Sequence, residues 1–272
     1  NLVFWDTHYY GGIKKYHWVA IPLAIHGVVV KTDGTRININ IGDKETDPVF
    51  CITDLLPHLG QEQMQKNAAK VIEGESLDLL IGSQPVKGEE KEGVTKFINA
   101  LLEKEYGFVE RDPLSAELEI VPAGKARDMG FDRSMIIAYG QDDRVCAYTS
   151  LVAMLEVDKV KRTTCCLLVD KEEIGSVGAT GMQSRFFENV VAEILTLMGK
   201  PNSVNVRRTL ENSRMLSSDV SAGYDPLYAS AFEKKNASYL GMGVVFNKFT
   251  GSRGKAGSND ANAEYMGFIR RV

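Results

Sequence analysis

Hydrophobic and polar positions alternate in the first part of the chain. Three valines at 28–30 precede the turn pair Asp33-Gly34, and isoleucines at 37, 39 and 41 then alternate with polar neighbours. Alternation places one face of a strand in a core, and Asp-Gly is a typical two-residue hairpin turn. The pattern predicts a β-hairpin over residues 27–41.

The spacing between apolar residues changes after Gly93 from the alternation of a strand to the period of a helix. Apolar residues recur at positions 94, 97, 98, 101 and 102 and stop before Gly107. This spacing is typical of one face of an amphipathic helix, and a glycine often follows the last helical turn. The intervening stretch from Gly82 to Gly93 is rich in Gly, Lys and Glu and predicts an exposed loop.

Strands and helices are predicted to alternate after Pro122. The expected order is a strand over 134–139, a helix over 144–156, a strand over 163–169, a helix over 180–198 and a short strand near Met215. Such alternation predicts an α/β domain with a largely parallel sheet. We therefore expect a β-rich region over residues 1–124 and an α/β domain over residues 125–272.

Composition narrows the class of protein. The chain has 272 residues, of which 44% are hydrophobic, and a formal charge of −4 with Lys and Arg scattered among Asp and Glu. No basic field is present to bind nucleic acid. No apolar run approaches the roughly 18 residues that cross a bilayer. The four cysteines lack metal-binding spacing, which favours buried thiols. We predict a globular, cytoplasmic protein with no nucleic-acid or membrane partner.

Carboxylates directly follow three of the predicted strands. They are Asp142 and Asp143, Glu172 and Glu173, and Asp219. The carboxyl ends of strands border the ligand crevice in open α/β sheets, so these acids are candidates to converge. Converging carboxylates repel one another unless cations hold them, which favours a pair of metal ions. Each acid alone is equally typical of a helix N-cap or a solvated turn, so both interpretations stay open.

Two metal ions about 3.5–4 Å apart can lower the pKa of a bridging water and stabilise the oxyanion that forms when this water attacks a carbonyl. A neighbouring carboxylate that binds no metal can then accept the proton of the water. The cluster therefore suggests hydrolytic chemistry.

The acids lie in three sequence blocks, in the order Gly140-Gln-Asp-Asp-Arg144, Asp170-Lys-Glu-Glu-Ile-Gly-Ser176 and Ser218-Asp-Val220. In this order they resemble the signature blocks of the aspartyl aminopeptidase and aminopeptidase I family of two-metal peptidases. Upstream, Tyr10-Gly-Gly12 and the stretch ending in Leu-Ala-Ile-His26 are similar to the same family. The resemblance implies a zinc-peptidase-like three-layer α/β/α catalytic domain, interrupted by a β-rich dimerisation module, that acts as a metal-dependent aminopeptidase on peptides.

The resemblance also implies roles for single residues. Asp142 matches the ligand that bridges both metal ions, Glu173 and Asp219 match ligands of one ion each, and Glu172 matches the general base. Zinc is the expected metal, with manganese or cobalt as alternatives. Asp143 stands where many relatives carry Asn, and a capping or supporting role is expected for it.

Two further residues match substrate contacts of the family. His26 matches a histidine that is thought to reach the active site of a neighbouring subunit, although a structural histidine is an alternative. Lys255 lies in a glycine-rich segment where relatives place a basic substrate contact, with an exposed loop as the alternative. The segment at 243–247 departs from the family's lysine-containing pattern, which leaves the preferred N-terminal residue open. The family implies a homo-oligomer of dimers that assemble into a dodecamer.

The family's two histidine ligands come from segments that have no counterpart in this sequence. His8, His17, His26 and His58 all lie outside blocks that match metal-ligand motifs. We therefore expect portions at both ends to be missing. Two alternatives follow: a different exopeptidase or deblocking peptidase on the same scaffold, or an assembly fragment without catalytic competence. The glycines at 175, 178 and 181 lack dinucleotide-loop spacing and predict a tight turn behind the acids.

Overall fold

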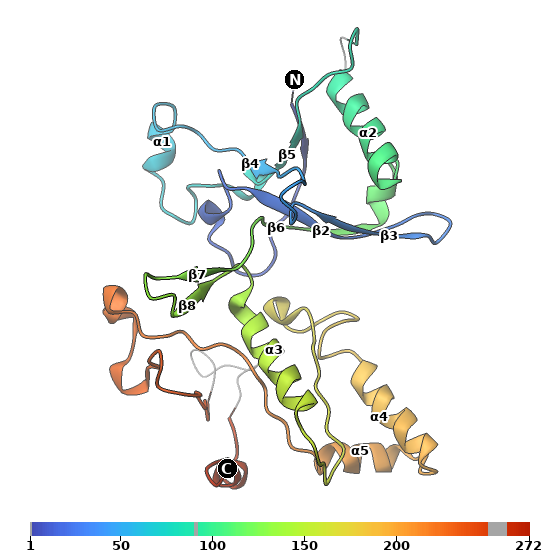
Figure 1. Cartoon of the computed structure of the whole chain (residues 1–272), viewed down its shortest axis with the longest axis vertical. Helices are drawn as coiled ribbons and strands as arrows, with labels where there is room; N and C mark the ends of the chain where they lie inside the picture. Colours follow the sequence, from blue (N-terminus) through green and yellow to red (C-terminus); the bar gives the residue numbers. More distant parts are fainter. Residues whose placement is uncertain (1, 90–91, 250–259) are drawn as a thin grey trace. The chain divides into compact units, whose positions relative to one another are not determined.

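The computed structural model describes residues 2–89, 92–249 and 260–272 (Figure 1). These residues form two compact units, one made of Asn1–Gln141 with Glu156–Leu216 and the other of Asp142–Leu155 with Ser217–Val272. The division predicted near residue 124 stays a prediction.

Antiparallel sheets form the N-terminal part of the first unit (Figure 1). One sheet has the order β3-β2-β6, with β2 at Leu23–Val30, β3 at Arg36–Ile41 and β6 at Ala116–Pro122. The other has the order β1-β5-β4, with β1 at Val3–Trp5, β5 at Leu79–Gly82 and β4 at Cys51–Ile52. In the first sheet Val30 pairs with Arg36 and His26 with Asn40, which confirms the predicted hairpin.

Gly27 lets β2 and β6 approach each other closely. Its φ is +144°, and a Cβ at this position would lie 1.9 Å from the carbonyl oxygen of Glu117. Only glycine fits such an approach without moving the neighbouring strand. The sheet therefore depends on this residue.

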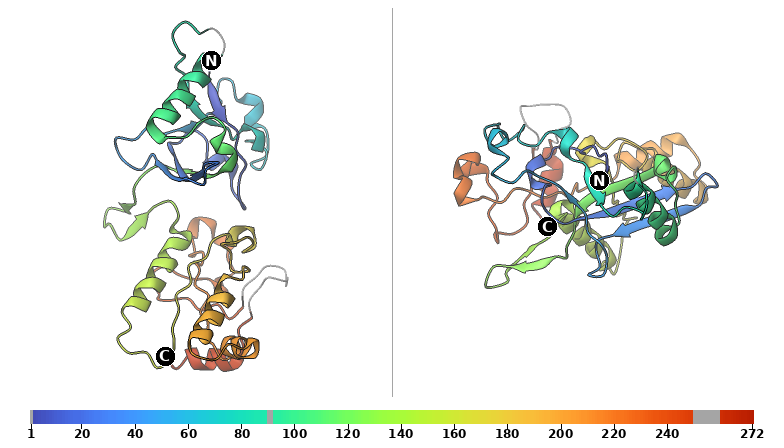
Figure 2. Two further views of the ribbon diagram at one scale, coloured as in Figure 1. Left: turned by 90° about the vertical axis from the view of Figure 1, so that its right-hand side faces the viewer. Right: turned by 90° about the horizontal axis from the view of Figure 1, so that it is seen from above.

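A continuous apolar core lies between these sheets and the segments around them. Its buried members are Leu23, Ile25, Val29, Ile39, Ile41, Ile52, Ile72, Leu77, Leu79 and Phe108. The predicted helix is confirmed as α2 at Gly93–Tyr106, which ends at Gly107 with a φ of +76° (Figure 2). It packs on β5, where a Cβ on Gly82 would come within 2.5 Å of Ile98 Cδ1. Each large apolar side chain buried here stabilises the fold by about 1.5–3 kcal/mol.

Helices dominate the chain beyond β6. The longer ones are α3 at Gln141–Leu155, α4 at Phe186–Leu197, α5 at Ser203–Glu211 and α6 at Ala263–Ile269. A one-turn helix, α1, occupies Gln61–Met64 in the N-terminal part. The predicted helices over 144–156 and 180–198 are confirmed as α3 and α4, although α4 begins later. Within the described ranges, no helix is long and apolar enough to cross a membrane.

The predicted parallel sheet needs correction. The strand expected over 134–139 appears as β8 at Met135–Ile137, which pairs antiparallel with β7 at Arg127–Met129. Neither 163–169 nor the stretch near Met215 forms a strand. Extended backbone becomes a strand only when a neighbour takes up its hydrogen bonds, and the described residues supply no such ladder to either segment. Parallel pairing among the described residues is limited to isolated bridges, such as Asp170 with Gly181.

Candidate metal centre

The first acidic block lies at the beginning of α3. Asp142 and Asp143 have non-helical backbone angles, with φ/ψ of −87°/109° and −116°/24°, and the peptide bond that joins them is cis. Regular helix follows them, and Asp219 lies in a segment without helix or strand in the same compact unit. The irregular first turn therefore presents two adjacent carboxylates next to a third that is distant in sequence.

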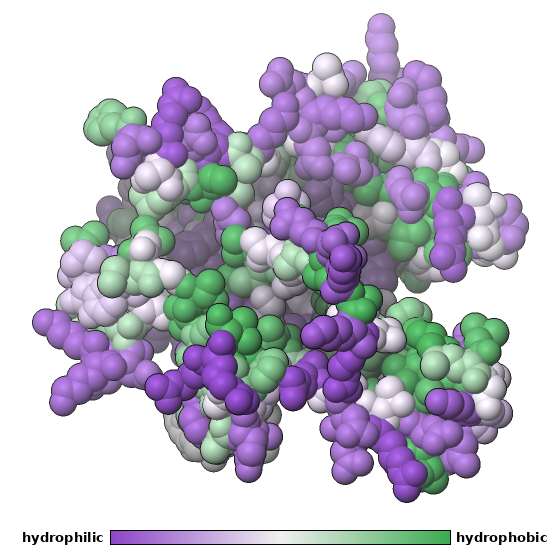
Figure 3. All heavy atoms as spheres, turned by 60° about the horizontal axis from the view of Figure 1, so that its bottom comes forward, coloured by the Kyte–Doolittle hydropathy of each residue, from purple (hydrophilic) through white to green (hydrophobic). Residues whose placement is uncertain are grey.

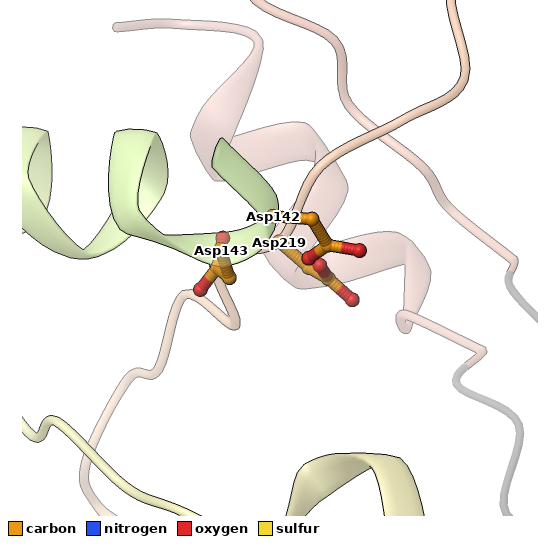
Figure 4. A group of neighbouring side chains, drawn as sticks. All are labelled: Asp142, Asp143 and Asp219. Carbon is orange, nitrogen blue, oxygen red and sulfur yellow. The ribbon is translucent and has the colours of Figure 1, made fainter. Parts of the chain in front are cut away.

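These three carboxylates converge. One oxygen of each of Asp142, Asp143 and Asp219 lies within 4.8 Å of the others. Figure 4 shows the carboxylates of Asp142 and Asp219 next to each other. Asp142 and Asp219 are exposed, whereas Asp143 is half-buried, and its Oδ1 is buried without a hydrogen-bond partner among the described residues. A buried carboxylate oxygen without a partner is costly, which a bound cation would offset.

Electrostatics also favour a cation here. Partial burial raises the pKa of Asp142, and the negative charges of Asp219 and Asp143 raise it further. Burial also raises the pKa of the nearby Cys146 thiol, with a further contribution from a hydrogen bond to Asp143. A divalent ion would stabilise the ionised carboxylates that now repel one another. The donor set of this cluster, three carboxylates, therefore fits a metal ion through oxygen ligands.

The second acidic block forms a separate turn in the other compact unit. Glu172 and Glu173 begin a short 3₁₀ helix, Glu172–Ile174, and both are exposed. Left-handed residues flank it, Lys171 with a φ of +66° and Gly175 with a φ of +95°. The turn thus has both ends fixed by backbone conformations that few residues adopt.

Glycines close the chain behind this turn, as predicted. A Cβ on Gly181 would lie 2.2 Å from the carbonyl oxygen of Ser176, so the two segments pass in close contact. The amide of Asp170 donates to the carbonyl of Thr180 at 3.1 Å. Close packing thus accounts for the glycine at 181, whereas Gly175 and Gly178 have the positive φ values +95° and +85°, which favour glycine.

Of the two predicted substrate contacts, the structure describes only His26. His26 lies on β2, where its Nε2 is 3.0 Å from Oδ1 of Asp43 and its side chain is 31% exposed. Lys255 lies outside the described residues. The structure therefore brings Asp142 and Asp219 together, adds Asp143 to them, and places Glu172 with Glu173 on their own turn and His26 on the β2–β3 sheet.

Two residues for which the sequence predicts no role lie at the glutamate turn. Lys171 was part of a matching block but carried no assignment, and Gly11 lies in Tyr10-Gly-Gly12. A Cβ on Gly11, whose φ is +61°, would lie 3.1 Å from the Cβ of Glu173. The glycine pair was a signal for such a close approach, although its partner cannot be found from sequence.

Converging carboxylates are typical of divalent-metal centres. The fold and the site together therefore indicate a metal-binding protein of mixed α/β class. The chain belongs to the Aminopeptidase I zinc metalloprotease (M18) family, whose model matches residues 1–270. It is 60% identical over 273 residues to the probable M18 family aminopeptidase 1 of Clostridium acetobutylicum, in a match covering 100% of this chain and 59% of that protein. These findings confirm the predicted family.

Solved structures confirm the fold of the part that is present. An M18 aminopeptidase from Thermotoga maritima matches with a TM-score of 0.94 and 47% identity, covering 99% of this chain and 60% of that one. Aminopeptidase I from Clostridium acetobutylicum matches with a TM-score of 0.90 and 59% identity, covering 100% of this chain and 59% of that one. A more distant structure, 20% identical with a TM-score of 0.56, is the S. cerevesiae mApe1 dodecamer. The chain thus has the mixed α/β fold of M18 aminopeptidases over about three fifths of their length.

Proposed function

We propose that the protein containing this chain is a metal-dependent aminopeptidase that removes N-terminal residues from peptides, and that this chain carries the acidic part of its active site. The observation that carries the proposal is the convergence of the Asp142, Asp143 and Asp219 carboxylates within 4.8 Å in a chain of the M18 family. Cytoplasmic location and the three-layer α/β/α arrangement of the whole catalytic domain are part of the same proposal.

Asp142, Glu173 and Asp219 are the proposed metal ligands. In this assignment Asp142 would be a ligand of both ions, whereas Glu173 and Asp219 would each be a ligand of one. The family description favours zinc. Zinc sites commonly include nitrogen or sulfur ligands, so the carboxylates of this chain need further ligands, and they also suit manganese. When bound, the ions supply the Lewis acidity that activates a water and stabilises developing negative charge.

Glu172 is the proposed general base. A ligand carboxylate is committed to its cation, whereas the base must stay able to accept a proton. Glu172 takes a proton from the attacking water and returns it to the leaving amine, which is the usual double role of a carboxylate in hydrolysis. Its position beside Glu173 on one short turn allows the two side chains to divide these tasks.

His26 and Lys255 are the proposed substrate contacts. The Asp43 carboxylate accepts a hydrogen bond from Nε2 of His26, and in this proposal Nδ1 is the ring nitrogen that contacts a ligand. We propose that His26 acts in the active site of a neighbouring subunit within a homo-oligomer of dimers, up to a dodecamer. If so, mixing a His26→Ala protein with a Glu172→Gln protein restores activity through hybrid interfaces, and an inactive mixture contradicts action in trans.

The test compares peptides with a free and an acetylated amino terminus, using the whole protein with measured metal content. We expect cleavage of the free-amine peptide alone. Asp219→Asn should remove metal and activity together, whereas Asp158→Asn, at an exposed loop acid, should change neither. Preferred cleavage of the acetylated peptide would instead indicate a deblocking peptidase. Pure folded protein that holds no metal and cleaves neither peptide would favour an assembly role.

A further inference from the structure

Lys171 joins the glutamate turn to the N-terminal region of the same compact unit. We propose that Lys171 is a positioning residue that fixes the turn bearing Glu172 and Glu173, an inference that rests on the proposed roles of these two glutamates. It touches neither substrate nor metal in this proposal. Lys171 acts by fixing the backbone position from which the side chains of Glu172 and Glu173 extend.

The side chain of Lys171 is held by three groups. Its Nζ is 3.2 Å from Oε1 of Glu117 on β6, 3.2 Å from Oδ2 of Asp170, and 5.6 Å from the centre of the Tyr10 ring. Only 20% of the side chain is exposed. Glu117 keeps most of its own side chain in water, so that pair alone contributes little. The constraint comes from three contacts that converge on one ammonium from different directions.

The backbone of Lys171 is equally constrained. Its amide donates to Oδ1 of Asp170 at 2.7 Å, and its carbonyl accepts from the amides of Ile174 at 3.3 Å and Ser176 at 2.7 Å. A third amide, that of Gly175, donates to the carbonyl of Glu172 at 2.8 Å, so three backbone hydrogen bonds of the turn are accepted by Lys171 and the residue after it. Rotation at Lys171 would redirect both glutamates.

A lysine at this left-handed position indicates that its side chain makes contacts that stabilise the turn. A φ of +66° is left-handed, a conformation that glycine adopts at much lower cost than a residue with a Cβ. If only the turn geometry mattered, glycine would be the favoured residue. The cost of lysine here is offset by contacts that its ammonium makes to Glu117, Asp170 and Tyr10.

The N-terminal segment that meets Lys171 also meets Glu173. Tyr10 faces the ammonium, and the next residue, Gly11, lies so close that a Cβ would be 3.1 Å from the Cβ of Glu173. The turn is therefore positioned by adjacent residues of one segment as well as by β6. The geometry makes the N-terminal region a support for the metal-ligand turn.

The test uses zinc-loaded whole protein and three substitutions. Lys171→Met should lower kcat about 10- to 100-fold and weaken zinc binding by a similar factor, which is the usual effect of removing a partner that orients a metal ligand. KM should change by less than roughly threefold, because substrate contacts stay in place. Lys171→Arg should restore most of kcat, since it keeps the charge. Lys66→Met, which breaks an exposed pair with Glu73, is the matched control and should change none of these.

Amide hydrogen exchange at residues 174–176 provides a readout without activity or metal. Lys171→Met should speed this exchange at least roughly tenfold while the core amides of β2 stay protected. Unchanged exchange together with wild-type kcat and zinc affinity would overturn the inference. Loss of protection throughout the protein, without rescue by Arg, would overturn it as well, because Lys171 would then be a general stability residue. If the wild type proves inactive, the proposed function fails, and exchange at 174–176 alone decides whether Lys171 fixes the turn.

Discussion

The regions before and after residue 124 bury their apolar side chains to very different extents. Among the described residues, buried apolar side chains cluster between Leu23 and Val121, and only Leu195 and Val206 follow. Later segments leave large apolar side chains at the surface, such as Leu168, which is 60% exposed, and Val244, which is 86% exposed. Figure 3 shows hydrophobic side chains exposed over parts of the surface.

In the part of the chain that the structure describes, the apolar residues that form a core are mainly those whose partner strands lie nearby in sequence. In an antiparallel hairpin the partner strand follows directly in the sequence, whereas a parallel strand reaches its partner only through a longer crossover connection. The N-terminal region is of the first kind, because its strands pair antiparallel and it holds most of the buried apolar side chains. The proposed site residues follow residue 124, so we expect substitutions among them to affect activity more than stability. Four predictions test this difference between the regions.

The largest effect is expected from Glu172→Gln. Removing a general base lowers kcat by roughly 10²- to 10⁴-fold, whereas metal content and thermal stability should stay at wild-type values because Glu172 is exposed and is not among the proposed metal ligands. Steady-state kinetics with elemental analysis check this. Glu193→Gln, on the exposed face of α4, is the matched control. Full activity of a metal-loaded Glu172→Gln protein would rule out this role.

Leu79→Ala should destabilise the protein strongly. Leu79 is 0% exposed at the centre of the core, so its truncation should lower the free energy of unfolding by about 2–5 kcal/mol. Leu168→Ala makes the same chemical change at an exposed site and should stay within about 0.5 kcal/mol of wild type. Urea unfolding of both variants measures the contrast. Equal losses would mean that the two regions do not differ as described.

Gly27→Ala should also destabilise the N-terminal region, by an overpacking cost of about 1–3 kcal/mol or more. The new methyl group would meet the carbonyl oxygen of Glu117, which belongs to a rigid strand. Gly12→Ala is the control, because a Cβ there meets nothing within 4 Å. Thermal unfolding of the pair checks the prediction, and a neutral Gly27→Ala would show that β2 and β6 can separate at little cost.

The sequence predicts the elements whose packing and hydrogen-bond partners lie nearby in the chain. It does not predict those whose partners are distant in sequence. The hairpin over 27–41 and the helix ending at Gly107 follow from turn chemistry and a single apolar face. The stretch at 163–169 has the composition of a strand, yet its hydrogen-bond partners depend on distant chain. The convergence of Asp142 and Asp219 is predicted because each acid directly follows a segment that the sequence predicts to be a strand. The contact of Lys171 with Glu117 joins residues 54 apart and could not be inferred from either neighbourhood.

The smallest effect concerns pH and the stability of the metal-free protein. The raised pKa of Asp142 means that the folded state holds this proton more tightly than the unfolded state. Stability should therefore fall as pH rises from the unfolded pKa through the folded pKa, and the penalty is complete at neutral pH. Asp142→Asn should slightly raise Tm at neutral pH in EDTA, with little change in acid, and should abolish the rise that zinc gives the wild type.

Asp33→Asn is the opposite control for that experiment. A hydrogen bond from the backbone of Thr35 lowers the pKa of Asp33, so its ionised form stabilises the fold at neutral pH and this contribution is lost as pH falls. Its substitution should lower Tm at neutral pH and leave the zinc response intact. A destabilised Asp142→Asn protein in EDTA would show that the carboxylates do not repel one another.

Anomalous scattering at the zinc edge, from crystals of the zinc-loaded whole protein, tests the central claim most directly. We expect zinc peaks about 2.0–2.2 Å from carboxylate oxygens of Asp142 and Asp219, with a second ion sharing Asp142 and contacting Glu173. Zinc bound only at other residues, with the Asp142 and Asp219 carboxylates outside ligand distance, would contradict the assignment of this acidic cluster as the metal centre.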